Sequence, residues 1–485
     1  MTTALERFGT FAAGLRTARL DDAVRHHARR AVVDWFAAAL PGGVMPPATL
    51  AVRALADQVG QGRATLIPAG TPAGGQAAAL INGTAAHTVE FDDIYRDGLY
   101  HPGAPTIAAA LAAAELAGAD GDRLLAGVVA GYELSNRIAV AVNPRHYDFW
   151  HTTATVGCFG AAGACAVILD LDAAQTAHAL ATTATMAAGL QQAFLADAMS
   201  KPLHSGRAAE AGLLSARLAA EGVTGALDAL EGPRGFAAAM SRGTEIDWDA
   251  VTADLGRDWT ITRMTFKNHA ACGHVHAAVD AVKALTDEHG LTAADVERIE
   301  VGSYAKSKEI CGNPEPVTVF EAKFSLPYCV AAALVLGSVR RAAFEEAAMA
   351  DPTLRAVAAR VVHTVDPGCD AAFPKARSAR VAIVTRDGRR LERFAPTRKG
   401  DPDSPLTDAD LADKFRELAG PVLGAARSAE LLAGLQALGG ARPVRDLMAG
   451  AARAAAAEEV AGRPGGRSSP DHSRHPTIPV TGDHG

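Results

Sequence analysis

Apolar residues recur at helical spacing through most of the first 265 positions. In "GDRLLAGVVAGYELSNRIAVAV", the apolar positions 124, 125, 128, 129 and 132 follow three- and four-residue steps, the spacing of one buried helix face. The stretch "SGRAAEAGLLSARLAAEG" predicts another helix, with Ser205 as its N-cap and Gly222 at its end. Alanine dominates these stretches, which favours helix and lets neighbouring helices approach closely.

Three glycines in "GCFGAAGAC", at positions 157, 160 and 163, match a dinucleotide-binding fingerprint superficially. That fingerprint follows a strand, and no β-branched strand precedes this one. Glycine at three-residue spacing in alanine-rich sequence instead indicates tight contact between helices. We therefore predict a packed helix here and no nucleotide site.

The pattern changes near residue 267. "VERIEVGSYA" (296–305) and "ARVAIVTRDGRRLERFA" (379–395) alternate like strands, and the second contains a hairpin turn at 386–388. Helical stretches such as "LPYCVAAALVLG" lie between them. Helix resumes at "SPLTDADLADKFRELAG", where Thr407 can cap the helix and Asp410 can reciprocate.

These patterns predict a mainly α protein with a large all-helical domain and a smaller inserted α+β lid domain. The helical domain would be discontinuous, comprising residues 1–265 and 403–455, and the lid would comprise residues 266–402. Residues 456–485 are poor in apolar residues and rich in Gly, Pro and Ser, so we predict a disordered tail.

Composition and charge narrow the function. The chain has 485 residues, 49% hydrophobic and 21% charged, the balance of a globular protein with a large core. Its net charge of −7 provides no basic field for nucleic acid or anionic lipid, and its longest apolar runs look too short to span a bilayer. The N-terminus lacks a signal-peptide pattern, and six scattered cysteines suit reduced thiols. We expect a cytoplasmic protein.

Polar residues gather in "HTVEFDDIYRDGLYHPGAPT" (87–106). Asp92 and Asp93 are adjacent, and His101 stands at the start of a predicted helix. The stretch reads either as a solvated loop with helix-capping acids or as part of a reactive site. His87 and Glu90, three residues apart, could instead pair on one helix face.

Two further stretches carry basic or titratable residues. In "DFWHTTATVG", His151 lies among aromatic residues and threonines, where a histidine is more often a satisfied core residue than a catalyst. In "SKPLHSGRAAEAG", Lys201, His204 and Arg207 recur every three residues where a helix begins. The helix dipole and free N–H groups favour an anion there, so this set suits a carboxylate-bearing substrate; the alternative is an exposed basic turn.

The densest cluster is "KNHAACGHVH" (267–276). In an extended segment Cys272, His274 and His276 would point the same way, as zinc ligands do, but no second tract completes four ligands cleanly. Farther on, "EAKFSLPYCVAAALVLG" places Tyr328 at the start of an apolar helix, where it could donate a proton, bind a carboxylate or belong to the core.

Taken together and in order, these stretches resemble the 2-methylcitrate dehydratase and cis-aconitate decarboxylase (MmgE/PrpD) family over about residues 5–450. The motifs that carry the resemblance are "EFDDIYRDGLYHPGA", "GYELSNRIA", "HTTATVGCFGAAGA", "SKPLHSGRAAEAGLLSARLA", "FKNHAACGHVHAAVDA" and "KFSLPYCVAAAL". The resemblance implies a helical domain with an inserted α+β lid, a homodimer, and catalysis without metal or organic cofactor. Ile94-Tyr95 and Trp150 depart from the family pattern and bear on the substrate.

The resemblance also implies a set of site residues. The catalytic set is Asp93, His101, His151, Lys201, Lys267 and Tyr328, and the substrate-binding set is His204, Arg207 and His276.

The two lysines would neutralise charge that develops beside a substrate carboxylate, with His204 or Arg207 orienting other carboxylates. His101 and His151 would move protons, and Asp93 could hold a histidine in the required tautomer. We expect dehydration of a small di- or tricarboxylic acid, most simply a 2-methylcitrate-like hydroxy acid.

Other functions stay open at this point. Decarboxylation of a cis-aconitate-type acid would use the same histidine to protonate carbon, and epimerisation of an iminodisuccinate-type acid would use two groups on opposite faces. From other classes, a zinc-dependent hydrolase would use Cys272, His274 and His276. A non-catalytic helical scaffold would leave the cationic triplet and the histidines unexplained.

Overall fold

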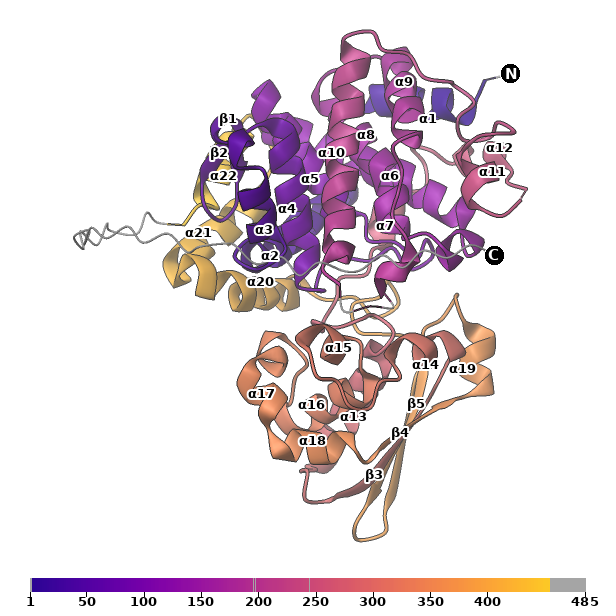
Figure 1. The fold of residues 1–485 in the computed structure, drawn as a ribbon, viewed down its shortest axis with the longest axis vertical. Coiled ribbons are helices and arrows are strands. Elements are labelled where there is room, and N and C mark those ends of the chain that lie inside the picture. The colour runs from indigo at the N-terminus through magenta and orange to yellow at the C-terminus, as the bar shows by residue number, and fades with distance from the viewer. Residues whose placement is uncertain (1, 195, 197, 244, 454–485) are drawn as a thin grey trace, which may run out of the picture. The chain divides into compact units, whose positions relative to one another are not determined.

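The computed structural model describes residues 2–453, except 195, 197 and 244, and these residues belong to one compact unit. Helices dominate it, which confirms the mainly α class (Figure 1). The predicted disordered tail, 456–485, lies outside the described residues. The division into a helical domain and an inserted lid stays a prediction.

The helices up to residue 252 come largely from the alanine-rich sequence, as expected. They are α1 (Ala4–Leu15), α2 (Asp22–Gly42), α3 (Ala48–Ala54), α4 (Gly75–Thr88), α5 (Gly103–Ala117), α6 (Gly121–Val142), α7 (Thr152–Thr155), α8 (Gly157–Ile168), α9 (Ala173–Ala184), α10 (Ser200–Ala220), α11 (Phe236–Met240) and α12 (Trp248–Thr252). Between α3 and α4 the chain forms a short hairpin that the helical pattern did not predict, made of β1 (Val59–Leu66) and β2 (Thr71–Ala73).

Helix α6 is long and apolar enough to cross a membrane by length and composition, contrary to the expectation that every apolar run is too short. The protein itself covers it, because 83% of its most apolar 18-residue window is buried. Its neighbours are α8 and α5, and Leu124, Leu125 and Val128 are fully buried. We therefore assign α6 to the protein core.

Strand β3 (Val296–Ser303) lies at the centre of a four-stranded sheet of order β4-β3-β5-β6. It pairs in parallel with β4 (Val361–Val365) and antiparallel with β5 (Ala379–Thr385), which continues through the predicted turn into β6 (Arg390–Ala395). Both predicted strand regions are thus confirmed. Helices of the same part of the chain accompany this sheet in Figure 1: α13 (His276–His289), α14 (Ala305–Cys311), α15 (Val319–Lys323), α16 (Leu326–Leu336), α17 (Glu346–Ala350), α18 (Pro352–Ala358) and α19 (Pro367–Ala372).

The chain then returns to the first helices. Helix α20 (Asp408–Leu423) packs on α2 and is followed by α21 (Ala425–Gln436) and α22 (Val444–Gly450). Thr407 and Asp410 form the predicted capping box at the start of α20. This return places α20, which follows the sheet in sequence, beside the N-terminal helices.

Helix α10 begins at Ser200, five residues before the predicted N-cap Ser205, which lies buried within the helix. The helix has this additional first turn because Lys201 pairs with the buried Glu90 and His204 with the buried His151. Glycines let α10 approach its neighbours closely: a Cβ at Gly206 would overlap the carbonyl oxygen of Leu80 in α4. In α8, the predicted helix contact is confirmed, since a Cβ at Gly160 would overlap Thr106 of α5.

The close contact between α10 and α4 predicts the effect of one methyl group. Gly206→Ala should lower the free energy of unfolding by about 1–3 kcal/mol, because the added Cβ forces two helix backbones apart. Gly14→Ala, in α1 with nothing near the added Cβ, should instead be neutral or stabilise by up to about 1 kcal/mol. Urea unfolding monitored by circular dichroism measures both. Equal stability of the two variants would contradict the close packing.

Candidate active site

The chain leaving α4 forms a turn held by three buried lysines. The backbone carbonyls of residues 89–91 accept hydrogen bonds, in order, from the ammonium groups of Lys323 (2.9 Å), Lys267 (2.9 Å) and Lys414 (2.6 Å). The middle residue, Glu90, has φ of 59°, the left-handed region that a non-glycine residue seldom adopts. The lysines therefore stabilise a backbone conformation that directs the Glu90 side chain, and such conformations are frequent at functional sites.

The Glu90 carboxylate lies between two of the predicted site residues. It forms ion pairs with Lys201, in the first turn of α10, and with Lys267, whose Nζ lies 3.5 Å from Oε2. Burial alone would raise the pKa of Glu90, but the two ammonium groups outweigh burial and hold the pKa well below its usual range. The lysine pair thus meets around a carboxylate that is charged at neutral pH.

Lys201 differs from Lys414 in the number of N–H groups that remain free to bind a ligand. Lys414 donates to Asp34, to the carbonyl of Phe91 and to that of Lys267, which uses all three of its N–H groups. Among the described residues, Lys201 bonds Glu90 alone. Lys414 is therefore structural, whereas Lys201 retains donors for a ligand.

His101 lies beside Asp92, immediately before α5. The Oδ2 atom of Asp92 lies 2.8 Å from His87 Nδ1 and 3.2 Å from His101 Nδ1. Burial would raise the pKa of Asp92, yet the two imidazoles hold it well below its usual range. Burial lowers the pKa of His101 to about 4, although Asp92 opposes this shift. At neutral pH, His101 is therefore an uncharged imidazole that a carboxylate orients.

A second pair of imidazoles adjoins the first. His151 Nδ1 lies 3.0 Å from His204 Nδ1, and the His151 ring stacks on His87 at a centroid distance of 5.6 Å. Burial, reinforced by neighbouring His87 and Lys201, holds the pKa of His151 well below its usual range, and burial lowers that of His204 to about 4. Both rings are neutral, so one nitrogen donates and the other accepts.

Of the predicted site residues, His101, Lys201 and Lys267 line a cavity of about 40 Å³, together with residues from both the helical and the sheet-containing parts of the chain. His151 and His204 adjoin this group but do not line the cavity. Arg377, between α19 and β5, is 5% exposed; its Nε has no hydrogen-bond partner, and none of the described acidic side chains forms an ion pair with it. A buried guanidinium without a counter-ion suits an incoming carboxylate. The lining residues are Glu90, Ile94, Leu99, Tyr100, His101, Tyr147, Phe194, Lys201, Lys267, Cys272, Gly273, His274, Phe324 and Arg377.

Asp93 faces away from this cavity, which corrects the expectation that it holds a histidine. Its carboxyl accepts from the Gly103 backbone N–H (3.0 Å) and the Tyr132 hydroxyl (2.7 Å). Burial, with the nearby Asp34 carboxylate, raises the pKa of Asp93 to about 8. The neighbouring Asp92 occupies the place beside His101.

Three other expected residues also lie elsewhere. The Tyr328 hydroxyl donates to the carbonyl of Ala343. His276 is buried, with Nε2 3.0 Å from the Ala271 carbonyl oxygen, and does not line the cavity. Arg207 is exposed on α10 and pairs with Glu210. Helical periodicity explains why Arg207 is exposed. Lys201 and His204 lie on the inward face of α10, and Arg207, a further three residues along, lies on the outward face.

Sequence reasoning missed Glu90, Asp92 and Arg377 as site residues. The sequence pattern suggests Glu90 only as a partner of His87 on a helix face, but α4 ends at Thr88. The adjacent aspartates, Asp92 and Asp93, indicate that one of them contacts the site. The turn at Glu90 determines that it is Asp92. Arg377 lies in a connecting segment without a pattern that would reveal it.

The proposed zinc ligands do not converge. His274 Nδ1 lies 2.7 Å from the Tyr304 hydroxyl, and His276 is engaged with Ala271. Within residues 2–453 as described, the group that could offer metal ligands is His87, Asp92 and His101, whose ligand atoms lie within 4.8 Å of one another. His87 and Asp92 form a hydrogen bond of 2.8 Å, and His101 lies 3.2 Å from the same carboxylate oxygen; both separations are shorter than the spacing of about 3.4 Å expected of tetrahedral ligands.

Comparison with protein families decides the identity of the chain. Residues 6–249 match the MmgE/PrpD N-terminal domain, and residues 269–437 match the MmgE/PrpD C-terminal domain. The protein belongs to the MmgE/PrpD family.

Several curated proteins are similar to this MmgE/PrpD protein over most of its length. The cis-aconitate decarboxylase-like protein oryM of Aspergillus oryzae is 27% identical over 83% of this chain and 88% of its own. Cis-aconitate decarboxylases of Aspergillus terreus and Homo sapiens are 26% and 27% identical, over 90% and 86% of this chain and 94% and 88% of their own. Family and relatives support a lyase-type activity.

Adjacent aspartates of this MmgE/PrpD protein provide a matched pair of variants. Asp92→Asn should lower kcat by about 10²-fold, because the amide no longer holds the His101 imidazole in one tautomer and orientation. Asp93→Asn should affect stability more than kcat, since Asp93 bonds Gly103 and Tyr132. Steady-state kinetics and thermal unfolding measure the two effects. A larger loss of kcat in Asp93→Asn would contradict the assignment.

Metal removal tests whether His87, Asp92 and His101 act without a bound metal ion. Prolonged treatment with EDTA followed by gel filtration should leave the turnover rate within about twofold, because the carboxylate rather than a cation orients the rings. Activity that disappears and returns on adding Zn²⁺ would show that the group binds a metal.

Proposed function

We propose that this protein is a lyase that decarboxylates a small unsaturated tricarboxylate of the cis-aconitate type without a bound cofactor. The observation that carries this proposal is the convergence of Lys201, Lys267 and Arg377, all buried, on one cavity beside the Asp92–His101 pair. The names of the similar curated proteins support decarboxylation as the reaction.

Charge explains how the substrate would bind. The three cations exceed the one carboxylate of Glu90 that faces them, so the cavity favours an anion. Lys201 has spare N–H donors, and Arg377 can bind a carboxylate through two parallel hydrogen bonds. Desolvation makes each contact stronger than it would be in water. Two or three carboxylates on one small molecule would use all these groups.

Decarboxylation then requires one carbon–carbon cleavage and one proton. As CO₂ leaves, the electron pair of the broken bond spreads through the double bond toward a remaining carboxylate, where Lys201 and Lys267 stabilise it. His101, protonated, transfers its proton to carbon and regains one from solvent, so that each turnover consumes one proton. The free imidazole is neutral, but substrate carboxylates beside it raise its pKa, so binding itself favours the protonated form.

Dehydration of a 2-methylcitrate-like hydroxy acid is the second candidate. It needs one group to remove a proton from carbon and another to protonate the departing hydroxyl. The His151–His204 pair, 3.0 Å apart and adjoining His87, supports this alternative because it offers a second proton carrier near the first.

A panel of substrates distinguishes the two reactions. Purified protein is incubated with cis-aconitate, 2-methylcitrate, citrate and an iminodisuccinate-type acid, and products are followed by NMR and mass spectrometry. Decarboxylation releases CO₂ and, in D₂O, places one deuterium on carbon. Dehydration releases water and leaves all carboxylates in the product. Turnover of none of these acids would contradict the proposal.

Replacing His101 tests its role in either reaction. His101→Ala should lower kcat by about 10²–10⁴-fold, because the proton carrier is lost, while circular dichroism and thermal unfolding stay close to the parent. His26→Ala, a half-exposed histidine of α2, is the matched control and should keep full activity. Near-normal turnover by His101→Ala would refute the assignment.

A further inference from the structure

A second and larger cavity lies on the other side of the turn that holds Glu90. Its volume is about 400 Å³, within the range of small-molecule sites. Val89 and Phe91 line it, whereas the Glu90 side chain between them belongs to the candidate active site. The walls come from α2 and the turn after it, α15, the segment 341–345 and α20.

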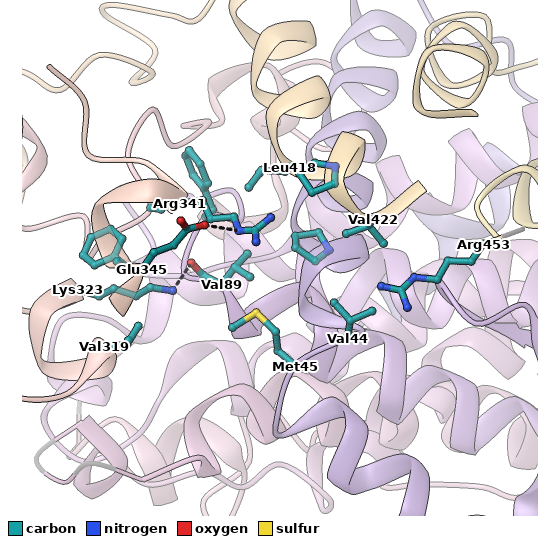
Figure 2. Close-up of a pocket in the computed structure, with 15 residues that line it drawn as sticks. Val44, Met45, Val89, Val319, Lys323, Arg341, Glu345, Leu418, Val422 and Arg453 are labelled. Carbon is teal, nitrogen blue, oxygen red and sulfur yellow. Dashed lines mark hydrogen bonds and ion pairs between the residues drawn. The ribbon is translucent and has the colours of Figure 1, made fainter. Parts of the chain in front are cut away.

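Most of this cavity is aliphatic or aromatic, with a buried cation, Lys323, at one end and an exposed cation, Arg453, at the other. Figure 2 shows Lys323, Arg341 and Glu345 at one end, Val44 and Val422 farther along, and Arg453 at the opposite end. Arg341 Nε lies 3.5 Å from a Glu345 carboxylate oxygen, so these two side chains balance each other at the exposed rim. The ammonium group of Lys323 forms no ion pair with any described acidic side chain.

Lys323 is a buried cation without a counter-ion. It is 8% exposed, and among the described residues its ammonium makes one hydrogen bond, to the Val89 carbonyl. Burial lowers the pKa of Lys323 to about 8, although Glu90 opposes this. An ammonium has three N–H donors, so two remain for a ligand without loss of the Val89 bond. A buried charge of this kind is costly unless something pairs with it.

We propose that this cavity binds an amphipathic monocarboxylate, with its carboxylate on Lys323 and its aliphatic chain along Val44, Met45, Leu418 and Val422. The chemistry differs from that of the active site. One unpaired cation at depth suits one carboxylate, and the aliphatic walls suit a hydrocarbon chain rather than further charges. The bound molecule would contact the turn after α2, α15 and α20 together and stabilise their packing.

Decanoate, used below the concentration at which it forms micelles, is the probe. Isothermal titration calorimetry with the full chain should give one site per chain, and decanoate should raise Tm because it binds only folded protein. The neutral decanamide should bind at least tenfold more weakly, since it lacks the charge that pairs with Lys323. Neither measurement depends on turnover, so failure of the proposed lyase function would leave this test intact.

Two variants locate the site. Lys323→Met keeps much of the side-chain volume but removes the charge together with the bond to Val89, so its Tm without ligand is measured too. It should weaken decanoate binding at least tenfold. Val44→Trp should block the apolar part to a similar extent without touching Lys323. Val365→Trp, on β4, is the control: Val365 is 41% exposed and Val44 37%. The control should bind decanoate like the parent.

Four results would overturn the proposal. They are no binding by the parent protein, unchanged binding by Val44→Trp, displacement of decanoate by cis-aconitate in simple competition, and a change of oligomeric state in Val44→Trp. The third would place decanoate in the active site, and the fourth would show that a second copy covers this surface.

Discussion

Three ammonium groups bonded to three consecutive carbonyls hold the centre of this molecule together. Lys323, Lys267 and Lys414 come from α15, from the segment before α13 and from α20, yet all bond the turn at 89–91. Segments far apart in sequence therefore meet at one short piece of backbone. Loss of any one lysine would leave a buried carbonyl without a partner and would release part of the left-handed turn at Glu90.

The same turn separates charges that would otherwise interfere. Asp34 pairs with Lys414 on one side, Glu90 pairs with Lys201 and Lys267 on another, and Asp92 lies against His87 and His101. Each of these three acids thus has its own cationic or imidazole partner. Asp93 has no such partner and has the raised pKa that burial imposes. Pairing outweighs burial for Glu90 and Asp92, whose pKa values are lowered, whereas burial still raises the pKa of Asp34 although Lys414 opposes it.

Local patterns predicted the elements that depend on local interactions. The apolar face of α6, the capping box of α20 and the hairpin of β5 and β6 follow from spacing and turn residues, and the structure confirms them. The sequence pattern did not predict the hairpin of β1 and β2, because "VGQGRATL" has two glycines and few β-branched residues. The extra first turn of α10 depends on partners of Lys201 and His204 elsewhere in the chain, which periodicity alone does not reveal.

The candidate site divides in the same way. Only the family resemblance predicted that four distant residues, Lys201, Lys267, His101 and His151, lie near one another. Their spacing in the sequence gives no reason to expect it. The choice between Asp92 and Asp93 depends on one backbone dihedral at Glu90, which sequence does not determine. Arg377 reaches the cavity through the path of the chain between α19 and β5, a property of the whole fold.

The small size of the active-site cavity has a kinetic consequence. A cavity of about 40 Å³ holds roughly three water molecules, far less than the tricarboxylate proposed as substrate requires. Each catalytic cycle must therefore include a widening that admits the acid and releases the product. Such rearrangements take microseconds to milliseconds, so this conformational change, and not bond cleavage, can limit kcat.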